Sequence, residues 1–180
     1  MRKILLLIIM LSSVAAVMAK TPICGRHKVD ADILYSFVAA RNPDFDPEVA
    51  EAFIEVGELY GIRGDIALCQ AIIETGWFRF EGSAMEPGDH NYCGLGVRRN
   101  GDRGCEFPTV QEGVTAMMQH LYAYACKDEL PDGEYLLDPR FGYVDRGSAR
   151  TWESLSGRWA RNPRYGKQII NMYKALLEHR

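Results

Sequence analysis

The best candidate for chemistry in this sequence is one carboxylic acid, Glu74, at the end of an apolar segment. The composition of residues 63–80 predicts a helix that is buried on all sides. Gly76, a residue type that adopts left-handed conformations at low cost, is expected to end it. Burial beside Trp77 and Phe78 and the negative end of the helix dipole would both favour the protonated form of Glu74. Glu74 therefore has the properties of a general acid.

The alternative is a structural role for Glu74. A buried glutamate is rare unless it is paired or has a function. Glu74 could be bonded to a buried arginine or to backbone amides. At the other end of the helix, Gly64 and Asp65 are expected to begin it, with Asp65 as the N-cap.

The elements that must position Glu74 are mostly helical. Apolar periodicity predicts further helices at residues 31–40, 47–60, 109–125, 152–159 and 167–178. Thr109 and Glu112 form a capping-box pattern at the start of one of them. In residues 47–60 the expected inward stripe is Val49, Phe53, Val56 and Leu59, and the expected outward residues are Glu48, Glu51, Glu55 and Glu58.

Residues 81–108 are rich in glycine and predict a loop lobe with short strands. Residues 92–97 and 105–107 could pair as a β-hairpin across Asn100 and Gly101. Together with the helices this predicts an α+β chain, mostly α, with a small loop or β-hairpin lobe.

Residues 1–19 have the pattern of a secretory signal peptide. Arg2 and Lys3 precede a short apolar run, and Val17 and Ala19 form a cleavage pattern. We expect residues 20–29 to be an irregular lead-in and residues 30–180 to be a single catalytic domain. The protein is thus expected to be exported, to the periplasm or the extracellular space, without a membrane span.

The charge balance argues against nucleic-acid binding. The chain has 21 Lys and Arg residues against 24 Asp and Glu residues, a formal net charge of −3. No basic tract is present that could neutralise phosphates. An uncharged or mixed polymer is a better partner, and we expect a monomer.

The five cysteines of an exported chain suggest disulfides, but an odd number leaves at least one free thiol. Cys93 and Cys105 flank a turn-rich segment that a disulfide could close, and free thiols are the equal alternative. His90, Cys93, Cys105 and His120 are of metal-ligand types. Their spacing matches no familiar zinc finger or ribbon, so no metal site is expected.

Several motifs, in this order, resemble the glucosaminidase-domain family from about Asp30 to Leu177. They are Glu74-Thr-Gly-Trp77, His90-Asn-Tyr-Cys-Gly-Leu-Gly96, Phe107-Pro-Thr-Val-Gln-Glu-Gly113, Gln119-His-Leu-Tyr-Ala-Tyr-Ala125, Gly157-Arg-Trp-Ala160 and Tyr165-Gly166. The resemblance implies a lysozyme-like fold. It also implies cleavage of peptidoglycan between N-acetylglucosamine and N-acetylmuramic acid, with Glu74 as catalytic acid and Tyr165 lining the site.

A second catalytic group is harder to assign. Glycosidases commonly use two carboxylates, and the candidates in the loop lobe are Glu86, Asp89, Asp102 and Glu106. Glu106, next to the Phe-Pro-Thr motif, is our candidate, and an exposed strand charge is its alternative role. If none of these reaches the scissile bond, the N-acetyl group of the substrate could assist instead.

The substrate-binding candidates lie beside the motifs. Trp77 could stack on a sugar face or wedge the helix end. His90 and Asn91 could bind sugar or cap a turn. Tyr92 is a further candidate with a core role as alternative, while Trp152 and Trp159 are expected in the core and His120 in the core or on the surface.

The leading hypothesis is therefore an endo-β-N-acetylglucosaminidase acting on the glycan strands of peptidoglycan. A muramidase or lytic transglycosylase of the same fold, or a non-catalytic glycan-binding module, are the alternatives. None of them needs a cofactor, since hydrolysis requires only acid, water and positioning.

Overall fold

The computed structural model describes residues 20–98 and 103–179, and the predicted signal peptide lies outside these residues. The described part contains five α-helices, so the mostly helical prediction is confirmed: α1 (Ala31–Ala39), α2 (Pro47–Tyr60), α3 (Gly64–Thr75), α4 (Val110–Ala125) and α5 (Tyr165–Glu178). The 3₁₀ helices are η1 (Pro87–Asp89), η2 (Phe141–Tyr143) and η3 (Trp152–Leu155). None of the described helices is long and apolar enough to cross a membrane.

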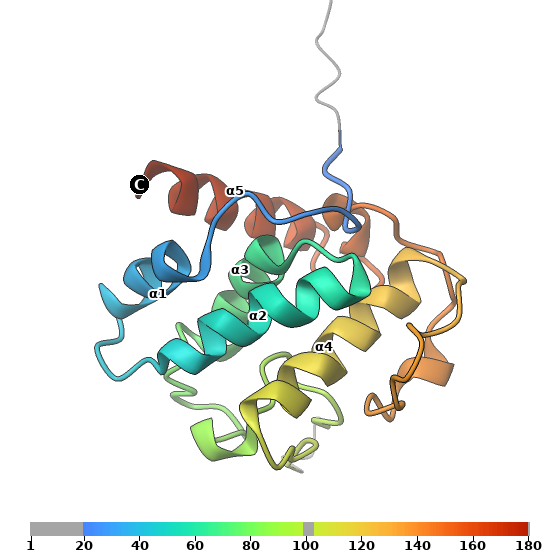
Figure 1. The fold of residues 1–180 in the computed structure, drawn as a ribbon, viewed down its shortest axis with the longest axis horizontal. Helices are drawn as coiled ribbons and strands as arrows, with labels where there is room; N and C mark the ends of the chain where they lie inside the picture. The colour runs from blue at the N-terminus through green and yellow to red at the C-terminus, as the bar shows by residue number, and fades with distance from the viewer. Residues whose placement is uncertain (1–19, 99–102, 180) are drawn as a thin grey trace, which may run out of the picture.

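Helix α3 lies behind α2 in Figure 1, with α5 above, α1 to the left and α4 crossing below on the right. Helix α2 packs against α1, α3 and α4, and α5 packs against α3 and η3. Burial of α3 on all sides follows the prediction, because Ile66, Leu68 and Cys69 are each 0% exposed. The element that carries Glu74 is thus enclosed by its neighbours over most of its length.

The close approach of α2 and α3 requires a glycine. A Cβ atom on Gly64 would lie 2.0 Å from the carbonyl oxygen of Phe53 in α2, which no side chain could tolerate. Helix α3 begins at this residue, and Arg63 is its N-cap. The prediction that Asp65 is the N-cap is therefore wrong, because Asp65 lies inside the first turn.

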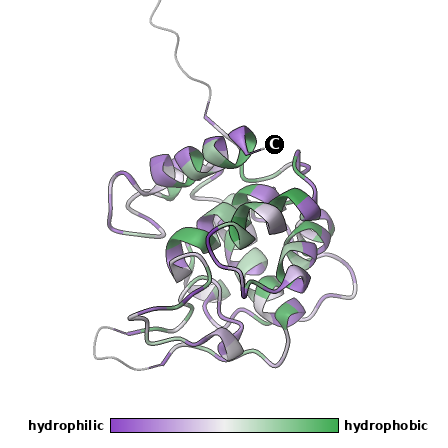
Figure 2. Cartoon of the chain, turned by 90° about the vertical axis from the view of Figure 1, so that its left-hand side faces the viewer, coloured by the Kyte–Doolittle hydropathy of each residue, from purple (hydrophilic) through white to green (hydrophobic). Residues whose placement is uncertain are grey.

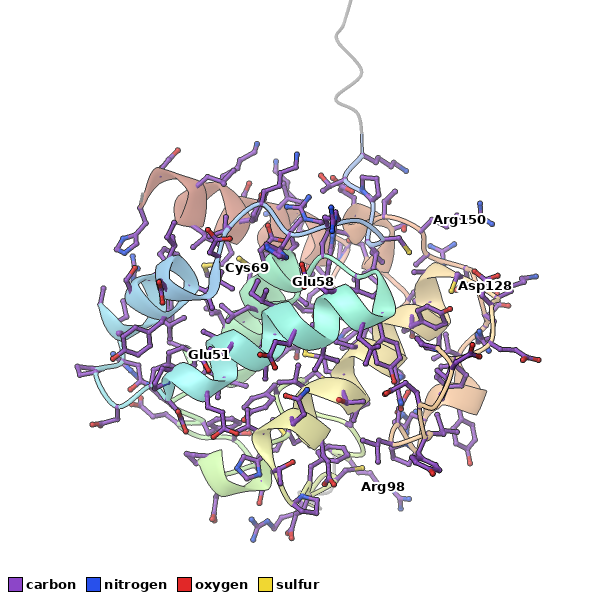
Figure 3. All side chains as sticks on the ribbon, viewed as in Figure 1. Glu51, Glu58, Cys69, Arg98, Asp128 and Arg150 are labelled. Atoms are coloured by element: carbon purple, nitrogen blue, oxygen red, sulfur yellow. The ribbon has the colours of Figure 1, made fainter. Side chains whose placement is uncertain are left out.

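Helix α2 is amphipathic, as expected. Glu48, Glu51, Glu55 and Glu58 are all exposed. Figure 3 shows Glu51 and Glu58 on the outer side of the helix, and Figure 2 shows hydrophobic and hydrophilic residues interspersed along the helices. The inward placement of Leu59 is wrong, since Leu59 is 49% exposed. Tyr60, which is 3% exposed, completes the inward stripe instead, because it continues the helical spacing of Val49, Phe53 and Val56.

The loop lobe contains no β-hairpin in its described part, and that prediction is wrong there. Gly94 and Gly96 have φ angles of 71° and 78°, which interrupt an extended strand. One backbone hydrogen bond joins the two segments, from the Cys105 amide to the Leu95 carbonyl at 2.7 Å. The side chain of Asn91 supplies the others: its Nδ2 donates to the carbonyl oxygens of Leu95 and Cys105, and its Oδ1 accepts from the Leu95 amide, each at 2.9 Å. The predicted turn at Asn100 and Gly101 lies outside the described residues.

The cysteines carry free thiols, and no disulfide joins Cys93 to Cys105. Burial raises the pKa values of the Cys69 and Cys93 thiols well above their ordinary value. Both are therefore apolar core groups rather than nucleophiles.

The irregular segment 20–29 is attached to the helices by backbone hydrogen bonds. The Ile23 amide donates to the Arg150 carbonyl at 3.0 Å, and the Arg63 amide donates to the Ile23 carbonyl at 2.9 Å. Ile23 is 0% exposed, so this segment contributes to the core.

A buried ion pair fixes the start of α3. Arg63 Nε donates to Asp65 Oδ1 at 2.8 Å, and Arg63 Nη2 donates to Asp65 Oδ2 and to the Tyr173 hydroxyl, each at 2.7 Å. The Lys28 amide donates to Asp65 Oδ2 at 2.9 Å. This pair connects segment 20–29, α3 and α5.

Replacing Asp65 by Ala should destabilise the protein by about 3–5 kcal/mol, because it leaves the buried guanidinium of Arg63 without its counter-charge. The measurement is the free energy of unfolding in urea. Asp32→Ala is the matched control, since Asp32 is an exposed acid in the first turn of α1 and should cost less than about 1 kcal/mol. Equal losses in the two variants would contradict this role of the pair.

Candidate active site

Glu74 lies in the last turn of α3, at a cavity of about 370 Å³. The cavity is formed between the end of α3, the loop lobe and the segment that leads to α5. Its lining residues are Glu74, Ser83, Met85, Cys93, Gly94, Val97, Trp159 and Ala160. Among the described residues, Glu74 is the only carboxylate that lines this cavity, which makes it the candidate acid there.

One carboxylate oxygen of Glu74 accepts two hydrogen bonds. The indole Nε1 of Trp159 donates to Oε1 at 3.1 Å, and the hydroxyl of Tyr165 donates to the same oxygen. Gln70, one helical turn before Glu74, donates its Nε2 to the Tyr165 oxygen at 2.9 Å. Because Tyr165 accepts from Gln70, its own proton is directed at Glu74.

This arrangement determines where Glu74 can carry a proton. Oε1 already accepts hydrogen bonds from Trp159 and Tyr165. A proton on Oε1 would therefore face the hydrogens of two donors, which is unfavourable. The acidic proton therefore belongs on Oε2. Oε2 is the oxygen that remains available to a reacting group in the cavity.

The electrostatics favour the protonated acid. Burial raises the pKa of Glu74 above its ordinary value, and the hydrogen bonds from Tyr165 and Trp159 lower it by a smaller amount. The result is a raised pKa for a half-buried carboxyl group. Burial and the nearby Glu74 also raise the pKa of Tyr165, which keeps its hydroxyl protonated as a donor.

The chain after Glu74 is held in an unusual conformation. Gly76 has a φ of 60°, as predicted for the end of α3, and Trp77, Phe78 and Phe80 also have positive φ values of 64°, 57° and 57°. Such values are rare for aromatic residues. Thr75 supports the turn, because its Oγ1 donates to the Ala71 carbonyl at 2.7 Å and accepts from the Phe78 amide at 2.9 Å. Backbone strain of this kind is typical of functional sites.

The structure brings Tyr165 to Glu74 but places Trp77 elsewhere. Trp77 lines a separate cavity of about 430 Å³. The guanidinium of Arg41 lies 4.3 Å from its ring centroid, and the Phe37 ring lies at 5.3 Å. Trp77 thus packs against α1, at a cavity that α5 also lines, and does not line the Glu74 cavity.

The other predicted sugar-binding residues also lie away from Glu74. His90 and Tyr92 line a cavity of about 280 Å³ next to the start of α2. His90 Nδ1 donates to the Phe107 carbonyl at 2.8 Å. Tyr92 is 3% exposed, and Asn91, at 0%, organises the loop lobe from inside. None of these three residues lines the Glu74 cavity, so their placement does not support a sugar-binding role beside Glu74.

Glu106 is not part of the Glu74 cavity lining. Its carboxylate is exposed and lies 3.6 Å from Arg103 Nε. Arg103 also pairs with Asp89 at 2.5 Å and with Glu86 at 3.7 Å. Three of the four candidate acids therefore surround one arginine, and Asp102 lies outside the described residues. No group of three His, Cys, Asp or Glu side chains in the described residues could hold a metal ion.

The cleft continues past Trp159. A second cavity of about 240 Å³ has four of its lining residues in common with the Glu74 cavity: Cys93, Gly94, Val97 and Trp159. It adds His120 of α4 and Arg140 of the segment before η2. The two cavities therefore adjoin, and we refer to them together as the cleft; adjoining cavities suit a chain-like substrate.

Residues 50–178 match the glucosaminidase family, described as mannosyl-glycoprotein endo-beta-N-acetylglucosaminidase. The chain belongs to the glucosaminidase family. It is similar to an "Uncharacterized protein" of Borreliella burgdorferi, with 34% identity over 159 residues that cover 86% of this chain and 76% of the relative. Among solved structures, the catalytic domain of the autolysin Auto from Listeria monocytogenes is similar, with a TM-score of 0.47 and 15% identity over 92% of each chain.

The sequence did not indicate three of the residues that organise this glucosaminidase-family site. Trp159 was expected in the core, although it lies in the Gly157-Arg-Trp-Ala160 motif. Gln70 lies four residues before Glu74 and hence on the same helix face, a signal that could have been used. Thr75 supports the strained turn, which is visible only in the backbone angles.

The Glu74 pKa can be measured directly by NMR titration of ¹³C-labelled glutamate. We expect a value above the ordinary 4.5 in the wild type and a still higher value in Tyr165→Phe, because that change removes a donor that stabilises the carboxylate. Tyr173→Phe is the control, since its hydroxyl bonds Arg63 instead. An unchanged or lower Glu74 pKa in Tyr165→Phe would contradict the role of this hydrogen bond.

Proposed function

We propose that the protein is an exported glycoside hydrolase that cleaves the glycan strands of peptidoglycan as an endo-β-N-acetylglucosaminidase, with Glu74 as general acid. The observation that carries the proposal is the position of Glu74. It is the one carboxylate of the described residues that lines its cavity, its pKa is raised, and its Oε1 is held by two donors. Membership of the glucosaminidase family supports the choice of a glycan substrate.

In the first step, Glu74 Oε2 donates its proton to the glycosidic oxygen as the bond from that oxygen to the sugar C1 breaks. The negative charge that develops on Glu74 is stabilised by the donors Trp159 and Tyr165 at Oε1. These bonds strengthen as the carboxylate forms. Trp159, Tyr165 and Gln70 therefore position the acid and assist its ionisation, while burial raises its pKa and so favours the protonated form beforehand.

The positive charge at C1 needs a partner on the other side of the sugar ring. Because no second carboxylate among residues 20–98 and 103–179 lines the Glu74 cavity, we favour the carbonyl oxygen of the substrate's own N-acetyl group as that partner. It forms a bond to C1 and a cyclic oxazolinium intermediate. Water then adds to C1, the ring reopens, and the proton of the water returns to Glu74, so the anomeric configuration is retained.

Two alternatives differ from this proposal, one in the glycosidic bond that is cut and the other in having no catalytic activity. A muramidase or lytic transglycosylase with the same acid would release a different reducing end. A glycan-binding module would bind without cleavage. Export to the periplasm or beyond, as proposed from the pattern of residues 1–19, would bring the protein to the cell wall.

Glu74→Gln should lower the release of reducing ends from purified peptidoglycan by about 10²–10⁴-fold, because the amide cannot donate the required proton. Glu106→Gln is the matched control and should retain most of the activity if the N-acetyl group serves as the second partner. Mass spectrometry of the wild-type products should find N-acetylglucosamine at the reducing end.

Three results would change this account. Undiminished activity of Glu74→Gln would overturn the assignment of the acid. Reducing-end or anhydro muramic acid would indicate the muramidase or transglycosylase reaction. If Glu106→Gln lost as much activity as Glu74→Gln, the Glu106 carboxylate, and not the N-acetyl group, would be the second catalytic group.

A further inference from the structure

The part of the cleft beyond Trp159 contains a cluster of charged groups that the proposed mechanism does not use. The Trp159 ring is the boundary between the two cavities: its Nε1 bonds Glu74 at 3.1 Å, and its ring centroid lies 4.8 Å from that of His120. His120 and Arg140 line the second cavity, and the loop at Gly94–Val97 forms its other wall. A substrate whose scissile bond lies at Glu74 would extend into this cavity.

The segment 135–140 is attached to α4 by the side chain of Gln119, which is 0% exposed. Gln119 Oε1 accepts from the amides of Leu137 at 2.7 Å and Asp138 at 2.9 Å. Its Nε2 donates to the Tyr135 carbonyl at 2.7 Å. Three bonds from one buried carboxamide thus fix an otherwise irregular segment.

The neighbouring residue of α4 fixes the same segment further along. His120 Nδ1 donates to Asp138 Oδ2 at 2.7 Å, and Asp138 Oδ1 accepts from the Arg140 amide at 2.8 Å. The Asp138 side chain is 0% exposed, so a buried carboxylate is satisfied by inward donors. The backbone of Arg140 is therefore held at a defined position on the cleft.

The guanidinium of Arg140 is exposed at this cleft and forms no ion pair with any carboxylate in residues 20–98 and 103–179. Its carbon lies 5.7 Å from the ring centroid of Tyr143. Burial and Asp138 raise the pKa values of Cys105 and Tyr124, and the positive charge of Arg140 offsets part of that rise. A planar guanidinium in this setting matches a carboxylate, which it can bind through two parallel hydrogen bonds.

We infer that Arg140, presented by the segment that Gln119 and His120 hold, forms a subsite for a carboxylate carried by the muramic acid residue of the substrate. The inference rests on the proposed function, since it names a feature of the polymer bound at Glu74. The carboxylate can belong to the lactyl group of a stripped strand or to the peptide stem of an intact one. The subsite would make the protein prefer acidic glycan strands to neutral ones.

The experiment compares three soluble substrates. One is glycan strands stripped of stems by an amidase, which have free lactyl carboxylates. The second is the same strands with those carboxylates converted to methylamides, and the third is strands with intact stems. Arg140→Gln should reduce kcat/KM about tenfold, mainly through KM, on at least one of the two acidic substrates. It should not change kcat/KM on the methylamide strands.

The controls separate charge from packing. Arg140→Lys should recover part of the loss, because it keeps the charge but not the planar fork. Arg150→Gln removes the charge of another exposed arginine, labelled at the right of Figure 3, that lines neither cavity. Kinetics of the Arg150→Gln variant should match those of the wild type.

If Arg140→Gln lowers kcat/KM on stripped strands alone, Arg140 binds the lactyl carboxylate. If it lowers kcat/KM on stem-bearing strands alone, Arg140 binds a carboxylate of the peptide stem. No loss on either acidic substrate, or an equal loss on the methylamide strands, would overturn the subsite. Calorimetric binding of the same strands to Glu74→Gln and to Glu74→Gln with Arg140→Gln gives the same comparison without turnover. If the wild type cleaves none of the substrates, the proposed function fails, and this binding difference still decides the subsite.

Discussion

The proposed chemistry of this protein depends on the balance of forces at one carboxyl group. Burial at the end of α3 disfavours the charged form of Glu74, while Trp159 and Tyr165 favour it by donating to one oxygen. Burial is the larger effect, so the pKa of Glu74 lies above its ordinary value and the protonated form persists to higher pH than in a free glutamate. The donors come from 85 and 91 residues further along the chain, which means that the whole fold is needed to assemble the site.

The rest of the molecule can be understood as support for that group. Gly64 allows α2 to cover α3, and the Arg63–Asp65 pair connects the start of α3 to α5, the helix that begins with Tyr165. At the other end, Thr75 holds the strained turn that follows Glu74. A helix enclosed in this way has little freedom to move, which suits a catalytic group that must be preorganised.

Local signals in the sequence predicted the local features well. Glu74 in the last turn and Gly76 as the end of α3 follow from apolar composition and glycine chemistry, and both are found. Contacts between residues far apart in the chain leave no such local pattern in the sequence. Trp159 was therefore expected in the core and not as a hydrogen-bond donor to Glu74. The hairpin prediction failed because Gly94 and Gly96 interrupt the strand and most of the bonds between the two segments come from the side chain of Asn91, which residue type alone does not reveal.

The most direct test of the central claim is the pH dependence of kcat/KM on peptidoglycan strands for the wild type and Trp159→Phe. Glu74 must be protonated to act, so activity should be lost as the pH rises through its pKa. Removing the indole donor destabilises the carboxylate and raises this pKa. The account therefore predicts that the alkaline limb of the Trp159→Phe profile lies at higher pH than that of the wild type, whatever the change in maximal rate. An alkaline limb at the same or lower pH would contradict the claim that this hydrogen bond tunes the catalytic acid.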